Sequence, residues 1–362
     1  MPTPPQRFLV IRLSSIGDIV HALPAVSALA ESYPHTEITW AIEDRYAALL
    51  DGNPCVHRVI RIDTLGWRKR IFSARTLGEV TSAIRRLREE RYDAVIDFQG
   101  LIKTGIMARL CRASRRIGYA KSGHREPGAG LFYTEEVALQ DGMHVIEENL
   151  ALAKNLGARP ARWKFPLPRR EKDERYIEAQ LRAIGAQELI IVNPGGGWAA
   201  KRWSPENYAS LIARMAPSQA EPIARPEPEH RTKTARAIIL TGSPADESDI
   251  AAILRQAACE HAHYLPTTLS QYIALARRAR LFVGGDTGPM HLAAALDVPV
   301  VAIMGPTDPR RNGPFSASDV ALSNHGPVDH TRRAKDSQFL EGIPVDDVFA
   351  AVQKRLESIH AR

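Results

Sequence analysis

Three loop segments of the 362-residue chain combine glycine with acidic, basic or hydroxyl side chains in patterns that suit a ligand-binding site. The first, LSSIGD, places Ser14, Ser15, Gly17 and Asp18 between a short apolar run and a helical pattern. In doubly wound sheets, ligands bind at such strand ends. Asp18 suits either a general base or an amino-terminal helix cap, and both interpretations stay open. The segment lacks GxGxxG, which disfavours a dinucleotide site.

The second segment, LIIVNPGGGWAAKRW, is an apolar run that leads into three glycines, Gly195, Gly196 and Gly197, and then Lys201. Bare backbone amides beside a lysine suit a diphosphate. The segment is not a P-loop, because no Gly-Lys-Ser/Thr follows at the required spacing. A glycine turn without any ligand is the alternative interpretation.

The third segment, LFVGGDTGPMHLAAAL, joins a strand pattern to Asp286, Thr287 and Gly288, which open a helix that carries His291. The free amides of a helix amino terminus and the Thr287 hydroxyl together favour an anion site. Asp286 as a simple cap and His291 as a packed core residue form the alternative. Two glycine-rich strand ends in one half of the chain favour the ligand site.

Alternating strand and helix patterns predict how these segments are positioned. Apolar runs predict strands at residues 8–12, 37–42, 58–62 and 94–98 and again at 189–193, 237–242, 281–285 and 298–304; helical periodicity predicts helices at 19–32, 76–91 and 344–359. This alternation is typical of the α/β class with parallel sheets. Proline-rich, charged residues 158–173 predict a linker, and residues 216–233, with four prolines, predict a mobile excursion.

Length and composition narrow the class of protein. A chain of 362 residues predicts two domains, and 44% hydrophobic with 25% charged residues excludes disordered and fibrous classes. No apolar run reaches 18 residues and no signal-peptide pattern precedes the first strand, so we expect a cytoplasmic protein. Cys55, Cys111 and Cys259 lack CxxC spacing and are expected to be buried thiols, and the twelve histidines lack metal-ligand spacing. We therefore expect no metal.

The net charge of +7 is concentrated in one segment. Residues 61–125 contain 16 basic and 6 acidic side chains. An excess of this size favours an acidic partner such as phosphate, nucleic acid or an anionic membrane surface, and an ordinary solvated basic face is the alternative.

Four segments together resemble glycosyltransferase family 9, the lipopolysaccharide heptosyltransferases, over nearly the whole chain. They are RLSSIGDIVHALPAV (12–26), YDAVIDFQGLIKTG (92–105), NPGGGWAAKRWSPENY (193–208) and GGDTGPMHLAAALDVPVVAIMGPTDP (284–309). Two more, WRKRIFS (67–73) and REPGAGLFY (125–133), resemble the heptosyltransferase I branch, which adds the first heptose to Kdo-lipid A.

The resemblance implies a GT-B fold of two Rossmann-like doubly wound domains that face a central cleft. Residues 1–168 would form the acceptor-binding domain and residues 169–343 the nucleotide-sugar-binding domain. A carboxyl-terminal helix over residues 344–362 would be able to pack back on the first domain.

It further implies inverting, metal-independent transfer of L-glycero-D-manno-heptose from ADP-heptose to Kdo of Kdo-lipid A in inner-core synthesis. No cofactor is expected, because ADP-heptose is a substrate. Asp18 matches the family's catalytic aspartate. The expected donor-binding residues are Gly195, Gly196, Gly197, Lys201, Asp286, Thr287, Gly288 and His291. The expected acceptor-binding residues are Ser15, Gly17, Arg68, Lys69, Arg70, Gln99, Lys103 and Arg125. The basic segment would also dock peripherally on the anionic inner leaflet, on its cytoplasmic face.

Other functions stay open beside this one. Heptosyltransferase I usually has a hydroxyl-rich Thr-Thr-Arg-Asp-Asp-Lys donor loop, whereas this chain has glycines and alanines before Lys201. Heptosyltransferase II, or a family 9 transferase with another donor sugar, is therefore an alternative. A nucleic-acid-binding protein is suggested only by charge, and no recognisable module supports it. A non-catalytic sugar-nucleotide sensor is disfavoured by the presence of Asp18.

Overall fold

The computed structural model describes residues 7–70, 72–120, 126, 128–159, 161–197, 201–216, 236–305, 307–316, 319–324 and 338–360. The chain forms two compact units, Met1–Arg169 and Arg170–Arg362. The division falls one residue beyond the boundary expected from the sequence. Among the described residues, no helix is long and apolar enough to cross a membrane.

The first unit is built on a six-stranded sheet with the order β3-β2-β1-β4-β5-β6, in which every pair of neighbours is parallel. Its strands are β1 (Arg7–Ile11), β2 (Glu37–Glu43), β3 (Arg58–Ile62), β4 (Arg91–Asp97), β5 (Arg112–Tyr119) and β6 (Glu135–Val137). The central strand RFLVI is almost continuously apolar, as expected for a parallel strand with both faces covered.

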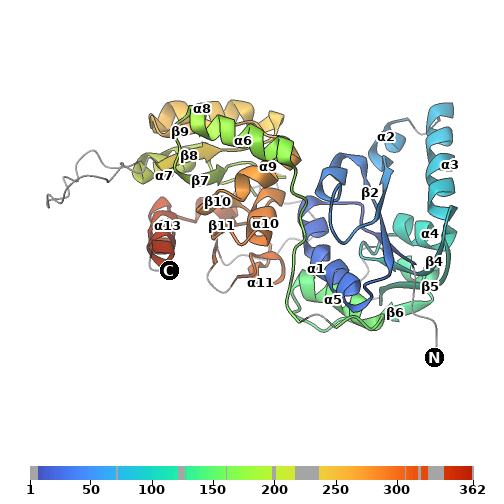
Figure 1. The fold of residues 1–362 in the computed structure, drawn as a ribbon. Helices are drawn as coiled ribbons and strands as arrows, with labels where there is room; N and C mark the ends of the chain where they lie inside the picture. Colours follow the sequence, from blue (N-terminus) through green and yellow to red (C-terminus); the bar gives the residue numbers. More distant parts are fainter. Residues whose placement is uncertain are drawn as a thin grey trace. The chain divides into compact units, whose positions relative to one another are not determined.

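Helices cover both faces of this sheet (Figure 1). The helices α1 (Ile16–Ser32) and α5 (Val145–Asn155) pack together on one face, and α3 (Ala74–Arg88) and α4 (Ile102–Leu110) pack together on the other. Three short elements complete the unit: η1 (Asp44–Leu49), α2 (Thr64–Lys69) and η3 (Ala129–Phe132). One core cluster joins Leu9, Ile11 and Val95 of the sheet to Leu87 of α3 and Ala108 of α4.

The second unit repeats the plan with the order β12-β11-β10-β7-β8-β9, again parallel throughout. Its strands are β7 (Glu188–Asn193), β8 (Arg236–Leu240), β9 (Ala262–Tyr264), β10 (Leu281–Gly285), β11 (Val300–Met304) and β12 (Val320–Ser323). Its helical elements are α6 (Glu171–Ala183), α7 (Pro205–Met215), η5 (Pro244–Asp246), α8 (Glu247–Ala257), α9 (Leu269–Ala276), α10 (Gly288–Ala295), α11 (Pro309–Asn312), α12 (Gln338–Glu341) and α13 (Val345–His360).

The carboxyl-terminal helix α13 belongs to the core of the second unit. Val348, Ala351 and Val352 join the same apolar cluster as residues of α7 and β11. The indole Nε1 of buried Trp203 donates to the carbonyl oxygen of Ile343 at 3.1 Å, which ties the start of α13 to the residues before α7. The return of this helix onto the first domain stays a prediction.

In both sheets, which are parallel throughout, the order in which successive strands are added reverses at the centre. Strand order runs outward from β1 to β3 on one side and from β4 to β6 on the other, and the second sheet does the same from β7 and β10. The loops that follow β1 and β4, or β7 and β10, therefore diverge to opposite faces. The carboxyl ends of these strand pairs are the topological switch points at which ligands bind in doubly wound folds.

The strands predicted from apolar runs are all present, within three residues at either end. The strands β5, β6, β9 and β12 were not predicted; β6, β9 and β12 are edge strands, and β5 lies between β4 and β6. Cys111 is buried as expected, but Cys55 and Cys259 are only half-buried, so that expectation was wrong for two of three thiols. Of the predicted excursion, residues 217–233 lie outside the described residues.

Close approach of β10 to β7 gives a first testable prediction. A Cβ on Gly284 would lie 2.6 Å from the Asn193 carbonyl oxygen and 3.0 Å from the Phe282 ring. We expect Gly284→Ala to lower the free energy of unfolding by about 1–3 kcal/mol, because the two backbones must separate. Urea unfolding of the variant and the native chain measures this difference in the free energy of unfolding. Gly78→Ala is the matched control, since its Cβ would meet nothing within 4 Å and helix propensity improves. Equal stability of Gly284→Ala and the native chain would contradict the close approach.

Candidate functional site

The ends of β1 and β4 are clamped to each other at the first switch point. The Gln99 side-chain oxygen accepts hydrogen bonds from the backbone of Leu13 at 2.9 Å and Ser14 at 3.3 Å. Arg12, which is only 2% exposed, donates to the Phe98 carbonyl oxygen. Gln99, predicted as an acceptor ligand, therefore lies beside the loop of Ser15, Gly17 and Asp18 and holds its backbone.

Asp18 occupies the first turn of α1, and both of its oxygens have partners. One accepts hydrogen bonds from the backbone amide and the hydroxyl of Ser15, each at 3.0 Å, in a capping box. The other lies 2.5 Å from an Arg12 guanidinium nitrogen. Ser15 is therefore the N-cap residue of α1, and Asp18 supports that cap from the third helical position without being the cap itself. The carboxylate also keeps 16% exposure, so a solvent-accessible edge is left for chemistry.

A second polar chain lies at the same edge of the sheet. Lys103, at the start of α4, donates to the Thr64 hydroxyl at 3.3 Å, and Thr64 in turn donates to the buried carboxylate of Glu43. Burial lowers the pKa of the Lys103 ammonium; the nearby charge of Arg68 also lowers it, and Glu43 opposes both.

The predicted basic ligands separate into different environments. Arg68 and Lys69 are exposed on α2, whereas Arg70 lies 3.4 Å from Glu79 and 3.8 Å from Asp63. Arg68 therefore lies one helical turn beyond Thr64, the partner of Lys103, whereas Arg70 turns toward Glu79 of α3. Arg125 lies outside the described residues.

A buried pair below this cluster was not predicted from the sequence. Asp97, at the end of β4, is fully buried, and its carboxylate accepts a hydrogen bond from the Tyr133 hydroxyl at 2.7 Å. Burial raises the pKa of both groups, and the Asp97 charge raises that of Tyr133 further. Gly118 makes room for the Tyr133 ring, which a Cβ would approach to 2.2 Å. The backbone amide of Gln99 also donates to Asp97, so this pair supports the clamp.

In the second unit the glycines bring two strand ends together. A Cβ on Gly285 would lie 3.1 Å from the Lys201 carbonyl oxygen. The Asn193 side chain, at the end of β7, donates to the carbonyl and hydroxyl oxygens of Thr241 after β8. The residues that follow β7, β8 and β10 therefore converge on one edge, around the predicted donor residues.

The Asp286 carboxylate is the centre of this convergence. One oxygen lies 3.1 Å from His291 Nε2, and the other pairs with the Lys201 ammonium and accepts a hydrogen bond from the Thr307 hydroxyl at 2.9 Å. Burial alone would raise the pKa of Asp286. The hydrogen bond to His291 and the charge of Lys201 outweigh burial and hold that pKa well below its ordinary value. The carboxylate therefore fixes the positions of its three partners.

The amino terminus of α10 adjoins this carboxylate. Thr287 is its N-cap residue, and the Thr287 hydroxyl donates to the Gly285 carbonyl oxygen at 3.3 Å. Gly288 begins the helix, so unpaired amides lie beside the Lys201–Asp286 pair. This combination of positive helix terminus and ammonium group is suited to an anionic ligand.

The glycine loop after β7 has partners that the sequence analysis did not identify. A Cβ on Gly195 would lie 3.0 Å from the Asp246 carboxylate, which accepts hydrogen bonds from Ser243 and pairs with Arg202 at 3.0 Å. The pattern Ser-Pro-Ala-Asp after β8 is a capping-box signature and was the available signal. Gly196 and Gly197 follow at the surface, and residues 198–200 lie outside the described residues.

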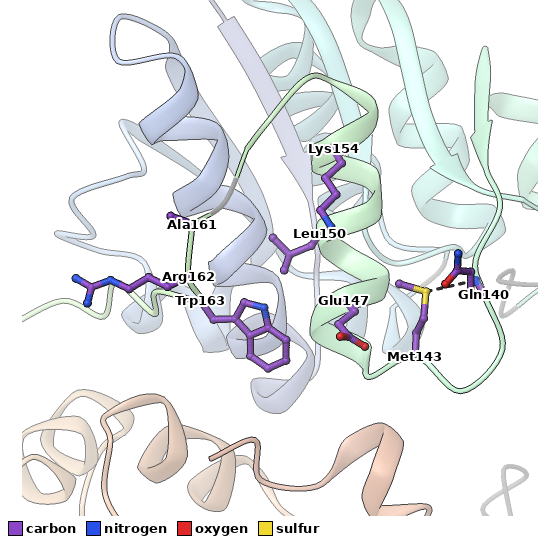
Figure 2. A pocket seen from close by; sticks show the side chains of 8 residues that line it. All are labelled: Gln140, Met143, Glu147, Leu150, Lys154, Ala161, Arg162 and Trp163. Atoms are coloured by element: carbon purple, nitrogen blue, oxygen red, sulfur yellow. Dashed lines mark hydrogen bonds between the residues drawn. The ribbon is translucent and has the colours of Figure 1, made fainter. Parts of the chain in front are cut away.

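A cavity of about 380 Å³ lies elsewhere in the first unit, between α5 and residues 161–163 (Figure 2). Its lining contains none of the catalytic, donor-binding or acceptor-binding residues that were predicted from the sequence and that the structure describes. The lining residues are Gln140, Met143, Glu147, Leu150, Lys154, Ala161, Arg162 and Trp163. Among the residues that the structure describes, no group of three or more His, Cys, Asp or Glu side chains is arranged to hold a metal ion.

Comparison with known proteins agrees with this architecture. Residues 80–339 match the model of glycosyltransferase family 9 (heptosyltransferase). A lipopolysaccharide heptosyltransferase 1 of Pseudomonas aeruginosa is 31% identical over 325 residues, which cover 89% of this chain and 84% of the relative. The Escherichia coli heptosyltransferase WaaC with ADP has a TM-score of 0.77 at 25% identity and covers 97% of this chain and 100% of its own. The structure of the same enzyme with ADP-2-deoxy-2-fluoro heptose has a TM-score of 0.75 at 26% identity and covers 96% of this chain and 99% of its own.

Two Rossmann-like units, each with polar loops at its switch point, make this chain a glycosyltransferase of the GT-B fold. The resemblance seen in the sequence is confirmed by the family match and by the extent of the identity. The chain belongs to glycosyltransferase family 9.

The buried Lys201–Asp286 pair gives a prediction for stability. Asp286→Asn leaves the Lys201 ammonium without its counter-charge, so we expect a loss of about 3 kcal/mol in the free energy of unfolding at neutral pH. Because the folded pKa of Asp286 is depressed, its contribution is complete above about pH 4 and is lost as the pH falls below that value. Chemical unfolding at several pH values measures both effects.

Asp308→Asn is the matched control, because its ion pair with Arg310 is solvent-exposed and contributes less than about 1 kcal/mol. A difference between Asp286→Asn and the native chain that stays constant down to strongly acidic pH would show that the Asp286 charge does not stabilise the fold.

Proposed function

We propose that this enzyme transfers L-glycero-D-manno-heptose from ADP-heptose to Kdo of Kdo-lipid A, with inversion at the anomeric carbon. One observation carries the proposal: the chain is similar, over nearly its whole length, to a heptosyltransferase whose solved structures hold ADP and an ADP-heptose analogue. The lipopolysaccharide heptosyltransferase 1 of P. aeruginosa supports the same acceptor class.

The second unit would hold the donor. A sugar leaving from a diphosphate develops oxocarbenium character while negative charge gathers on the departing ADP. Lys201, the amides of Gly195, Gly196 and Gly197, and the α10 amino terminus at Thr287 and Gly288 would stabilise that charge, because they are positive groups fixed before the reaction begins. Asp286 and His291 contribute by holding Lys201 in place. No metal or other cofactor is needed in this scheme.

Asp18 would act as the general base. Its exposed carboxylate edge accepts the proton of the attacking Kdo hydroxyl, which then bonds to the anomeric carbon as the bond to the diphosphate breaks. Arg12 and Ser15 hold the carboxylate in one orientation. Asp18 can both support the helix cap and act as a base, because its partners Ser15 and Arg12 approach the carboxylate from within the protein.

The first unit would bind the acceptor. Kdo carboxylates and lipid A phosphates call for clustered cations, and Lys103 with Arg68 and Lys69 supply them at the edge that carries Asp18. Gln99, Ser15 and Gly17 shape the backbone beside Asp18. Arg70 and Arg125 complete the proposed set. The acceptor is a lipid, so we also propose peripheral association with the anionic inner leaflet from the cytoplasmic side.

One observation keeps a second function in view. The loop before Lys201 contains three glycines and two alanines in place of the hydroxyl-rich loop expected for heptosyltransferase I. Fewer side-chain donors reach the nucleotide sugar, so the chain is alternatively a heptosyltransferase II or a family 9 enzyme for another sugar. Comparison of ADP-heptose with other sugar nucleotides, on Kdo-lipid A and on heptosylated Kdo-lipid A, separates these possibilities by kcat/KM.

Loss of the base gives the first kinetic prediction. Asp18→Asn keeps an oxygen for the capping box but removes the proton acceptor, so we expect kcat to fall about 10²- to 10⁴-fold with unchanged donor affinity. Acceptor-dependent ADP release measures turnover, and calorimetry measures ADP-heptose binding. Asp44→Asn, on exposed η1, is the control. A fall of less than about tenfold in a folded Asp18→Asn protein would remove Asp18 from the role of base.

The positive charges of Lys103 and Arg68 in the proposed acceptor site give the second kinetic prediction. Lys103→Met and Arg68→Glu are each expected to lower kcat/KM for Kdo-lipid A about tenfold or more, through the acceptor KM, because charge-assisted contacts to phosphate or carboxylate are lost. The KM for ADP-heptose should not change. Arg85→Glu makes the same charge reversal on an exposed position of α3. Acceptor kinetics that respond equally to Arg68→Glu and Arg85→Glu would leave only a general charge effect.

A further inference from the structure

The large apolar side chains that are exposed in the structure gather in one part of the first unit. Phe72 is fully exposed and Leu131 is 86% exposed. Among the described residues, Tyr176 of α6 is the one other large hydrophobic residue of this kind outside the group. We name the group the apolar rim; its members are Leu65, Phe72, Leu77, Ile102, Ile106 and Leu131.

Neighbouring elements carry the apolar rim. The helix α2 contacts α3, α3 contacts α4, and α4 contacts η3. Leu77 lies in the first turn of α3, and Ile102 and Ile106 lie in the first two turns of α4. Because α4 follows β4 directly, its first turn lies at the carboxyl edge of the sheet. The rim therefore borders the edge that carries Asp18, Gln99 and Lys103.

Cations alternate with these apolar side chains. Arg68 and Lys69 are exposed between Leu65 and Phe72 in the sequence, and Lys103 follows Ile102. The hydrogen bond from Lys103 of α4 to the Thr64 hydroxyl of α2, at 3.3 Å, shows that α2 and the start of α4 are close in space. Single exposed apolar residues are ordinary, but several on adjacent elements, interleaved with cations at one edge, indicate an interaction surface.

We propose that the apolar rim inserts into the boundary between headgroups and acyl chains of an anionic bilayer, while Arg68, Lys69 and Lys103 contact the lipid phosphates. Charge complementarity selects this occupant: cations between the apolar side chains would be desolvated against a protein surface, but remain hydrated at headgroup depth. Lysine and arginine reach headgroups from such positions because their long stems follow apolar surface.

The apolar rim specifies how the proposed membrane association would occur, and its biological role rests on the proposed function. Insertion next to Lys103 would place the candidate acceptor cluster at headgroup level, where the sugar of a lipid-linked acceptor lies. The enzyme would then reach its acceptor without withdrawing the acyl chains from the bilayer.

Vesicle binding in the absence of donor and acceptor tests the surface directly. We expect the full chain to bind vesicles of phosphatidylcholine with phosphatidylglycerol, and to bind pure phosphatidylcholine weakly. Phe72→Ser and Leu131→Ser should each weaken binding to the anionic vesicles about tenfold, because each loses a large part of an apolar side chain's transfer free energy. Tyr176→Ser, an exposed apolar position of the second unit, is the matched control and should bind as the native chain does.

A depth measurement separates insertion from electrostatic contact. Phe72→Trp should show additional fluorescence that brominated acyl chains quench, relative to the native chain. Absence of binding to anionic vesicles would overturn the proposal. Binding that Phe72→Ser and Leu131→Ser leave unchanged would overturn insertion and leave contact through charge alone. Dimerisation that both variants abolish, without vesicle binding, would assign the rim to a second copy of the chain.

Activity measurements keep this test distinct from the proposed function. With an acyl-free Kdo acceptor in solution, Phe72→Ser should match the native kcat/KM, and with vesicle-embedded Kdo-lipid A it should fall about tenfold, in line with its weaker binding. Vesicle binding without transfer to either acceptor would reject the proposed reaction and leave the surface standing. Transfer that is equal for both proteins on embedded acceptor would reject the surface and leave the reaction standing.

Discussion

The reversal of strand order at the centre of each sheet is the constraint on which both candidate clusters depend. Because the chain leaves β1 and β4 toward opposite faces, the peptide groups at their carboxyl ends are not covered by a common loop. Side chains must satisfy them instead, and Gln99 does so for Leu13 and Ser14. In the second unit the Asn193 side chain joins the end of β7 to Thr241 after the neighbouring strand β8, and after β10 the Asp286 carboxylate gathers Lys201, His291 and Thr307. Fixed polar residues at these positions are thus a requirement of the fold before they serve any ligand.

The two clusters differ in electrical character, although the scaffolds are alike. In the first unit, Asp18 and Glu43 sit close to the cations Arg12 and Lys103, so both signs of charge are held at one edge. In the second, the acidic partner of Lys201, Asp286, is buried, and the amides of α10 add to the positive potential. A cluster with both signs of charge suits proton transfer from a hydroxyl group, whereas a positive cluster suits a diphosphate.

The sequence predicted the central strands well because buried parallel strands are continuous apolar runs, as in LIIVN of β7. The strand β5, next to the edge strand β6, reads RASRRIGY and is exposed to solvent over much of its length, so its charged residues concealed the strand pattern. The glycine-rich ends were predicted from spacing, and the structure explains Gly284 and Gly285 by backbone approach. Arg12, Asp97, Tyr133 and Asp246 were missed, since their roles depend on partners distant in sequence. Only Asp246, in its capping box, had a local signal.

The hydrogen bond from Trp203 to Ile343 ties the residues after Lys201 to the segment that leads into α13. The last helix then packs on α7 and completes the core beneath that loop. During synthesis, β7 and α7 emerge from the ribosome well before α13 does. The loop that carries Lys201 thus gains this anchor only after the segment around Ile343 has been synthesised, and a nascent chain that already has every predicted donor residue still lacks it.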